Sequence, residues 1–400
     1  MRAADRPHLS YFYDLPLPNE QAAGIQIVRT ARALCERGAA VTLLFGPVKS
    51  EAAVHAHYGI TPHPRLRIES VFGPGISSRE FRQRLRRLFD GWAAAPKHVI
   101  IGRGESGLGV FEEARRVVAP PNVRFLWEAH RTCASQAEAF FHPRVARRWR
   151  LRRHVRRIAE REQAALDLAH GMVCVTDGVA DALRADYEVP RQTLILPGGT
   201  EVRDDPLPSD ADRDIDVLYV GKLQGRKGVP DLIDAMPRLP GVRLWLVGGD
   251  DESVAAMRQR GRALGVHDRL RFEGYVPPSA VRRYLRRARV GVCPLPQGVS
   301  EIADRFTCPL KILEMMAVGT PIVTTDTAAV RRIVTHDRTA WLVEPNDPMA
   351  LAHGIRTLLE RRPLANRLAI EARKAAVAFG WDRRAERFLE FATTLEPGGS

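Results

Sequence analysis

Cysteine and long apolar runs are scarce in this sequence. Five cysteines are scattered along the 400 residues and none forms a C-x-x-C pair, which indicates free thiols in a reducing compartment. No run approaches the roughly eighteen apolar residues that a membrane span requires. The first thirty residues contain Asp5, Asp14 and Glu20 in place of the apolar core of a signal peptide. We therefore expect a soluble, cytoplasmic protein.

Lysine is also rare, although the chain is strongly basic. The net charge is +14, which leaves nucleic acid, an anionic membrane surface and acidic substrates open as partners. Only six of the 61 basic residues are lysine. Three of the six, Lys222, Lys227 and Lys311, fall in segments that we interpret below as anion-binding turns. A compact ammonium is not interchangeable with a planar guanidinium, so lysine at these positions favours specific phosphate contacts.

Metal and dinucleotide motifs are missing from the places where they are expected. The loop after the first expected strand, residues 14–24, has no G-x-G-x-x-G fingerprint. No D-x-D occurs in the loops that follow the expected strands, and no histidines or carboxylates are clustered as metal ligands. We therefore expect no metal and no other cofactor, with fixed positive charge in place of a divalent cation.

Strands and helices alternate along the whole chain, which predicts an α/β protein. A polar, acidic, proline-containing run near residues 197–214 marks a linker, after which a second alternating series begins. At 45% hydrophobic residues, the chain can build two cores. We predict two facing Rossmann-like domains with a cleft between them, at residues 1–197 and 198–380. Residues 381–400 are expected to form a helix that docks back on the first domain, and a tail.

The stretch Phe306–Thr324, F-T-C-P-L-K-I-L-E-M-M-A-V-G-T-P-I-V-T, is the strongest candidate site. Pro309 suits the first turn of a helix, and Gly319 ends it. The free N–H groups and positive dipole end of this helix attract an anion such as a diphosphate, and Lys311 adds a formal charge beside them. Glu314, one turn further, can accept hydrogen bonds from an attached sugar. An ordinary amphipathic helix with a surface Lys–Glu pair is the alternative.

Two further segments bring glycine or charge to the ends of expected strands. The run Gly221–Gly228, G-K-L-Q-G-R-K-G, is a basic turn directly after a strand. In the first half, W-E-A-H ends a strand and places Glu128 and His130 at its carboxyl edge, where such folds bind ligands. Gly24 would let backbone approach a ligand near that edge. A structural histidine and a simple loop glycine remain open as alternatives.

The most basic segment, Arg144–Arg161, has helical spacing. Leu151, Val155 and Ile158 make one apolar stripe, with arginines on the remaining surface. A solvated helix face and a peripheral contact with an anionic membrane are two interpretations. Nucleic-acid binding is the weakest, because aromatic interleaving and recognised binding motifs are absent. We expect no nucleic-acid partner.

The motifs of the second half resemble those of family 4 (group 1) of the retaining glycosyltransferases, which have the GT-B fold. In order they are D-V-L-Y-V-G-K-L-Q-G-R-K-G, L-W-L-V-G-G-D, F-E-G-Y-V and C-P-L-K-I-L-E-M-M-A-V-G-T-P-I-V. The first half matches only in outline, through A-A-G-I-Q, W-E-A-H and L-P-G-G-T-E. The resemblance implies retaining, metal-independent transfer of a sugar from a nucleoside-diphosphate sugar to a hydroxyl acceptor.

The resemblance also implies roles for individual residues. Lys222 and Lys227 would hold the donor diphosphate, Glu314 the donor ribose, and His130 would reach the transferred sugar. These four are the candidate catalytic residues. The candidate substrate-binding residues lie in the glycine turns, around the nucleobase and under the phosphates: Gly24, Gly221, Gly249, Gly274, Tyr275, Val276, Thr307, Leu310, Lys311, Ile312 and Leu313.

One position departs from the family pattern. Much of the family has a glutamate eight residues before the one matched by Glu314, and Phe306 stands there instead. The sequence resembles the variant S/T-x-P-x-K-x-x-E, beginning at Thr307. Glu301 and Asp304 are nearby acids, but the pattern assigns neither to the site. An epimerase or phosphorylase of the same fold and an inactive nucleotide-binding homologue remain alternatives.

Overall fold

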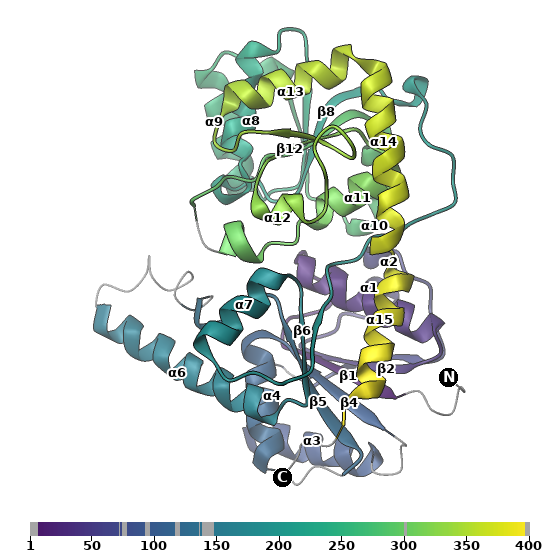
Figure 1. The fold of residues 1–400 in the computed structure, drawn as a ribbon, viewed down its shortest axis with the longest axis vertical. Helices are drawn as coiled ribbons and strands as arrows, with labels where there is room; N and C mark the ends of the chain where they lie inside the picture. The colour runs from purple at the N-terminus through teal and green to yellow at the C-terminus, as the bar shows by residue number, and fades with distance from the viewer. Residues whose placement is uncertain are drawn as a thin grey trace. The chain divides into compact units, whose positions relative to one another are not determined.

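The computed structural model describes residues 7–71, 73, 78–92, 97–116, 121–135, 137, 148–299 and 302–396. The chain divides into two compact units (Figure 1). Unit 1 comprises Met1–Pro197 and Asp382–Ser400, and unit 2 comprises Gly198–Trp381. The chain therefore passes between the units twice, after Pro197 and after Trp381.

Unit 1 is built on a seven-stranded sheet in which neighbouring strands are parallel. The strand order is β3-β2-β1-β4-β5-β6-β7. The strands are β1 His8–Tyr13, β2 Ala40–Phe45, β3 Leu66–Ser70, β4 His98–Gly102, β5 Val123–Ala129, β6 Gly171–Cys174 and β7 Thr193–Ile195. At the centre, Tyr11 of β1 lies opposite Leu43 of β2 and Ile101 of β4. These three residues are fully buried. Burial on both faces explains why the strands appear in the sequence as continuous apolar runs.

Unit 1 has several helices in the described part of the chain, and the first of them begins earlier than expected. They are α1 Ala22–Glu36, α2 Glu51–Tyr58, α3 Ser78–Trp92, α4 Gly104–Arg116, α6 Arg148–Leu168, α7 Asp177–Asp186 and α15 Trp381–Thr394. Because α1 starts at Ala22, Gly24 lies in its first turn and not in the loop where we expected it. A Cβ atom at Gly24 would lie 2.5 Å from the hydroxyl of Tyr58. The glycine therefore allows α1 to pack closely against α2.

The last helix, α15, belongs to unit 1 although almost the whole of unit 2 separates it from the first-domain strands in sequence. Phe388 is fully buried, and its ring centroid lies 6.3 Å from that of Tyr11 in the central strand. Phe391 lies beside Gly171, where an added Cβ would be 3.1 Å from its ring. An apolar stripe on α15 thus covers part of the unit 1 sheet.

The basic segment forms α6, and its residues 144–147 lie outside the described part of the chain. Leu151 and Ile158 are buried and Val155 is half-buried, so the expected stripe faces the protein. The same face buries Glu162, whose carboxylate accepts hydrogen bonds from the backbone N–H of Cys133 at 2.9 and 2.8 Å. Within the described residues, no helix has the length and apolar character needed to cross a membrane.

Unit 2 is built on a second parallel sheet, with the strand order β10-β9-β8-β11-β12-β13. The strands are β8 Ile215–Val220, β9 Leu244–Val247, β10 Leu270–Gly274, β11 Ala288–Cys293, β12 Ile322–Thr325 and β13 Trp341–Val343. The helices are α8 Val229–Ala235, α9 Asp251–Ala263, α10 Pro278–Arg287, α11 Leu310–Val318, α12 Ala328–Arg331, α13 Pro348–Glu360 and α14 Arg362–Ala376. Successive residues pack on opposite faces, as Leu218 and Tyr219 show by joining different core clusters. Two apolar layers therefore enclose the sheet.

Both sheets reverse their strand order at the centre, between β1 and β4 in unit 1 and between β8 and β11 in unit 2. Open parallel sheets bind ligands at the carboxyl ends of the strands beside such a reversal. In unit 2 the loop after β8 contains the basic turn 221–228, and the chain after β11 leads into α11. The topology therefore brings the two strongest predicted motifs to one edge of one sheet.

Candidate functional site

Lys311 and Tyr219 form the centre of the site in unit 2. Tyr219 is buried near the end of β8, and its hydroxyl accepts a hydrogen bond from Lys311 Nζ at 2.9 Å. The ammonium also lies 4.0 Å from the centroid of the Tyr219 ring. The Tyr219 hydroxyl in turn donates to the backbone carbonyl of Lys222 at 2.9 Å. One phenol thus connects the basic turn to the first turn of α11.

The electrostatics of this pair keep a positive charge at the strand end. Burial alone would lower the pKa of Lys311, but the interactions with Tyr219, Cys293 and Glu314 together outweigh burial and raise it. Burial raises the pKa of Tyr219, so its hydroxyl keeps its proton at neutral pH. Lys311 is therefore a half-buried ammonium at neutral pH, fixed at the carboxyl end of β8.

Glycines bring three loops together around this charge. The N–H of Gly221 donates to the carbonyl of Val247 at 2.8 Å, and the N–H of Gly248 donates to that of Gly274 at 2.7 Å. A Cβ at Gly221 would lie 3.0 Å from Lys311 Nζ, and φ there is +134°. A Cβ at Gly249 would lie 2.7 Å from the Leu223 side chain. The loops after β8, β9 and β10 therefore contact one another through glycine backbone beside Lys311.

The other two predicted lysines lie on the same basic turn. Lys222 is exposed, and Lys227 is half-buried in a 3₁₀ turn, Gly225–Lys227. The turn ends at Gly228, which has a φ of +70° and lies so close to the carbonyl oxygen of Pro294 that an added Cβ would be 1.5 Å from it. No side chain fits there, so Gly228 holds the basic turn against the end of β11.

Helix α11 contributes its amino end to the site and its apolar side chains to the core. Pro309 is the N-cap residue and not part of the first turn as expected, because its ψ of 93° is extended. Ile312 and Leu313 are fully buried, so their side chains pack in the core and only their backbone is left for a ligand. Leu310 is half-buried against Gly198. Glu314, half-buried one turn further along, interacts electrostatically with Lys311.

The remaining predicted residues of unit 2 surround this edge. Tyr275 follows β10 and is 41% exposed, whereas Val276 packs against the core. Thr307 is half-buried directly before the helix. Phe306 is 2% exposed in a π-helical turn, Ile302–Phe306, so the residue that replaces the family glutamate belongs to the core. Asp304 accepts hydrogen bonds from the Gly298 N–H at 3.2 and 3.1 Å. Glu301 lies outside the described residues.

The predicted pair of unit 1 lies in a buried charged cluster. Glu128 is the last residue but one of β5, and its side chain is 2% exposed. Its carboxylate is 3.6 Å from His130 Nε2 and 3.9 Å from Arg103. Burial would raise the pKa of Glu128, but His130 and the nearby arginines outweigh it and lower the pKa to about 2. Burial, assisted by Arg103, lowers the pKa of His130 to about 4. A carboxylate and a neutral imidazole therefore coexist at neutral pH.

Sequence reasoning missed two residues that connect these groups. Tyr219 stands in the strand D-V-L-Y-V, where period-two alternation indicates only that its side chain is buried. Arg384 donates to Glu128 at 2.7 Å from a position 256 residues later in the chain. No local pattern reports a contact at that separation.

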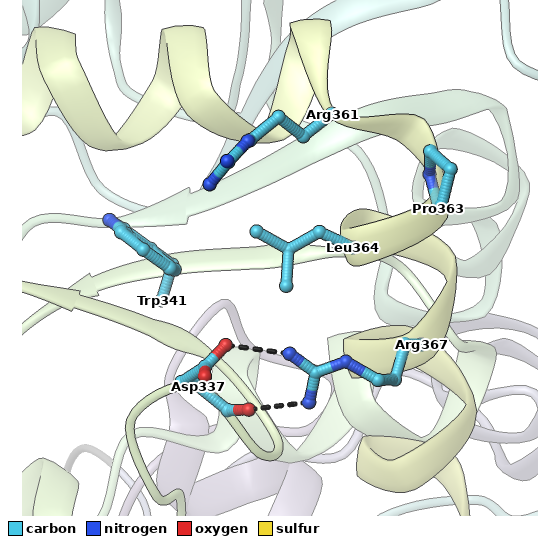
Figure 2. Close-up of a pocket in the computed structure, with 6 residues that line it drawn as sticks. All are labelled: Asp337, Trp341, Arg361, Pro363, Leu364 and Arg367. Atoms are coloured by element: carbon cyan, nitrogen blue, oxygen red, sulfur yellow. Dashed lines mark hydrogen bonds and ion pairs between the residues drawn. The ribbon is translucent and has the colours of Figure 1, made fainter.

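A hollow of about 470 Å³ lies elsewhere in unit 2 (Figure 2). Its lining residues are Asp337, Trp341, Arg361, Pro363, Leu364 and Arg367. Arg367 donates to the backbone and the carboxylate of Asp337, both at 2.7 Å. Trp341 begins β13, so the hollow lies at the amino edge of the sheet, opposite Lys311. It contains no predicted site residue, and we place the site at the carboxyl edge, where charge and topology agree.

Within the described part of the chain, no group of three or more histidine, cysteine, aspartate or glutamate side chains could hold a metal ion. The ionic character of the site in unit 2 comes instead from its lysines and from the amino end of α11. Such a set of donors is suited to a phosphate-containing ligand.

Residues 214–361 match the family model of the group 1 glycosyl transferases. This part of the second half is therefore similar to the group 1 glycosyl transferases. The matched segment includes the basic turn, the three glycine loops and α11.

The D-inositol 3-phosphate glycosyltransferase of Geodermatophilus obscurus is 30% identical over 222 residues, which are 50% of this chain and 47% of that protein. The phosphatidyl-myo-inositol mannosyltransferase of Mycobacterium leprae is 30% identical over 190 residues, 46% and 48% of the two chains. The matches thus span about half the length of these curated relatives.

Solved structures resemble this chain over nearly its whole length. Sucrose-phosphate synthase from Thermosynechococcus elongatus has a TM-score of 0.69 at 21% identity and covers 96% of this chain and 98% of its own. The Anabaena protein HepE, solved in complex with UDP-glucose, has a TM-score of 0.71 at 16% identity and covers 97% and 100%. At these identities the similarity establishes the fold. The expected GT-B class, with two Rossmann-like domains, is confirmed.

Proposed function

We propose that the protein transfers a sugar from a nucleoside-diphosphate sugar to a hydroxyl acceptor, with retention of configuration and without a metal ion. The observation that carries the proposal is the half-buried Lys311 ammonium, held by Tyr219 beside the backbone of Gly221 at the strand reversal of unit 2. A charge fixed in this way costs no reorganisation when a diphosphate develops negative charge.

The chemistry requires a nucleoside diphosphate to leave the anomeric carbon. The bond from that carbon to the diphosphate oxygen breaks, positive charge develops on the sugar, and the acceptor hydroxyl forms the new bond on the same face. Lys222, Lys227 and Lys311 stabilise the departing diphosphate, together with the amino end of α11. Positive charge in these groups would do the work that a divalent cation does in metal-dependent transferases.

The other roles follow the resemblance to family 4. Glu314 accepts hydrogen bonds from the donor ribose, and the loop at Gly274 and Tyr275 faces the nucleobase. His130 reaches the transferred sugar and, with its pKa lowered to about 4, is neutral at physiological pH. A neutral imidazole can accept or donate a hydrogen bond to a sugar hydroxyl. Phe306 cannot, so other groups hold the hydroxyls that the missing family glutamate would contact.

A thermal-shift screen of UDP, GDP, ADP and dTDP sugars tests the first step, because a ligand of the folded state raises Tm. UDP sugars come first in the screen, since the Anabaena protein was solved with UDP-glucose. Transfer is then measured with the stabilising donor and a panel of hydroxyl acceptors, with and without EDTA. NMR of the product reports the anomeric configuration. Loss of activity in EDTA or an inverted product would contradict the corresponding part of the proposal.

Two other functions use the same binding groups. A nucleotide-sugar epimerase or a phosphorylase would share the fold, and an inactive homologue would bind nucleotide without turnover. Donor incubated without acceptor separates them: an epimerase converts the sugar, a transferase gives at most slow hydrolysis, and a binder gives neither. A phosphorylase would require inorganic phosphate.

We also propose that the protein is cytoplasmic and that α6 contacts an anionic membrane surface. The helix exposes arginines along its outer side, and Trp149, 55% exposed, lies under Arg150 at 5.4 Å. Interfacial helices combine an aromatic ring with basic residues in this way. Sedimentation with phosphatidylglycerol vesicles, compared with phosphatidylcholine vesicles, tests this contact. Equal sedimentation with both would exclude an electrostatic one.

A further inference from the structure

Arg384, in the first turn of α15, makes several hydrogen bonds inside unit 1. It is 3% exposed. Its Nε donates to Thr30 Oγ1 at 3.1 Å, and its Nη2 donates to Glu128 Oε1 at 2.7 Å. Its Nη1 donates to the backbone carbonyls of Leu196, at 2.7 Å, and of Pro197. One guanidinium therefore connects α1, the end of β5 and the last residues of the first segment of unit 1.

The position of these carbonyls in the chain is informative. Leu196 and Pro197 are the last residues before the chain first leaves unit 1, and Arg384 follows its return at Asp382. Arg384 thus joins the outgoing and returning segments on the unit 1 side. On the unit 2 side the same two segments pair through backbone: the N–H of Thr200 donates to Phe379 at 2.8 Å, and the N–H of Trp381 donates to Thr200 at 3.1 Å.

The carboxylate that Arg384 binds is the one beside His130. Glu128 lies 3.6 Å from His130 Nε2, and its remaining charged neighbour is Arg103, at 3.9 Å. The buried hydroxyl of Tyr11, on β1, also faces this carboxylate. The guanidinium of Arg384 and the imidazole of His130 therefore lie at the same carboxylate oxygen, Glu128 Oε1.

We propose that Arg384 is a positioning residue for His130: it fixes Glu128 and, through Glu128, the imidazole, and it ties both to the segments where the chain passes between the units. The inference rests on the proposed function, in which His130 reaches the transferred sugar. Arg384 has no contact with substrate in this scheme. It acts through Glu128.

The charges around His130 give this role a readout other than activity. The imidazole is faced by Glu128 from β5, which raises its pKa, and by Arg103 after β4 and Arg384 on α15, which lower it. Replacing Arg384 by a neutral residue removes one of the two opposing charges and leaves the carboxylate. The pKa of His130 should then rise from about 4 toward its ordinary range. A residue that only packed α15 would not move it.

The test compares R384Q with R387Q in the full-length protein. Arg387 is a matched control, because it lies one turn further along α15 and donates to the backbone carbonyl of Ile195 at 2.9 Å without reaching Glu128. The pKa of His130 is measured by NMR titration of histidine-labelled protein, with its signal assigned by its loss in H130Q. Transfer kinetics are measured on the same proteins.

We expect R384Q to raise the pKa of His130 and to lower kcat about ten- to hundredfold with little change in KM for the donor, as misplacement of a reacting group does. R387Q should leave both unchanged. An unchanged His130 pKa in folded R384Q would overturn the proposal, as would kcat within about twofold of wild type.

A second variant covers the case in which R384Q does not fold, since it leaves a buried carboxylate without its partner. The double variant E128Q/R384Q removes both charges and should fold, yet kcat should remain about tenfold low because neither residue orients the imidazole. Wild-type kcat in the folded double variant would overturn the proposal. If the wild-type protein transfers no sugar with any donor, the proposed function fails, and the NMR titration still decides whether Arg384 controls His130.

Discussion

Removal of the Tyr219 hydroxyl is the most direct test of the site in unit 2. The substitution Tyr219→Phe deletes one oxygen that accepts from Lys311 Nζ and donates to the Lys222 carbonyl, each at 2.9 Å. The ring is retained, so the contact of the ammonium with the aromatic face, 4.0 Å from the centroid, persists. The perturbation is therefore confined to two hydrogen bonds.

The expected loss of stability follows from the chemistry of those bonds. A bond to a charged group contributes about 1.5–3 kcal/mol, and a neutral bond to a backbone carbonyl contributes about 1 kcal/mol. Tyr219→Phe should therefore lower the free energy of unfolding by about 2.5–4 kcal/mol. Freed from its acceptor, Lys311 no longer holds one position beside Gly221. We expect the Kd for the nucleoside diphosphate of the identified donor to rise about tenfold, equivalent to about 1.4 kcal/mol.

Urea denaturation and titration calorimetry measure the two quantities. Thr320→Val is a matched control, because it removes one buried hydrogen bond of unit 2, from Thr320 Oγ1 to the Leu285 carbonyl at 2.9 Å. It should cost about 1 kcal/mol of stability and leave the nucleotide Kd unchanged. If Tyr219→Phe binds nucleotide as wild type does, the hydroxyl does not position Lys311 for phosphate and the reasoning is refuted.

Three further outcomes are expected. Lys227→Ala should lower kcat/KM about a hundredfold, the usual effect of losing one hydrogen-bond donor to a developing charge. Steady-state kinetics with a confirmed sugar donor measure this effect, and unchanged turnover would count against the assignment. Burial, assisted by the charge of His8, holds the pKa of His98 at about 2, whereas the unfolded residue titrates near 6.5. As the pH decreases, the unfolded state therefore binds the proton first. The free energy of unfolding should decrease at pH values below 6.5, by about 2 kcal/mol at pH 5. Urea midpoints at pH 7 and pH 5 measure this decrease, and His98→Gln should weaken the pH dependence. Phe388→Ala should destabilise unit 1 by about 3–5 kcal/mol, measured by denaturation; a wild-type midpoint would show that α15 does not pack on the sheet as described.

Much of the fold and several segments of the candidate site could be predicted from the sequence, because they depend on residues that are close together in the chain. Nearly continuous apolar runs such as Val41–Phe45 indicate strands buried on both faces, and their alternation with helical periods predicts parallel sheets covered on both sides. The basic turn Gly221–Gly228 and the segment Thr307–Glu314 are each a continuous stretch of sequence. Their glycine and lysine spacing therefore predicts anion binding without any tertiary information. The sequence likewise marked Glu128 and His130 at a strand end, because an apolar run stops there.

Only the tertiary structure decided what holds these groups. Tyr219 joins Lys311 to Lys222 because β8 and β11 are neighbours in the sheet, and Arg384 reaches Glu128 because α15 returns to unit 1. Periodicity reports which side of an element is buried, but it carries no information about partners 92 or 256 residues away. For the same reason Gly24 appeared to be a loop residue, although it lies inside α1 against Tyr58. The candidate site residues could therefore be predicted from the sequence, whereas the residues that hold them in place depend on contacts formed only when distant segments pack.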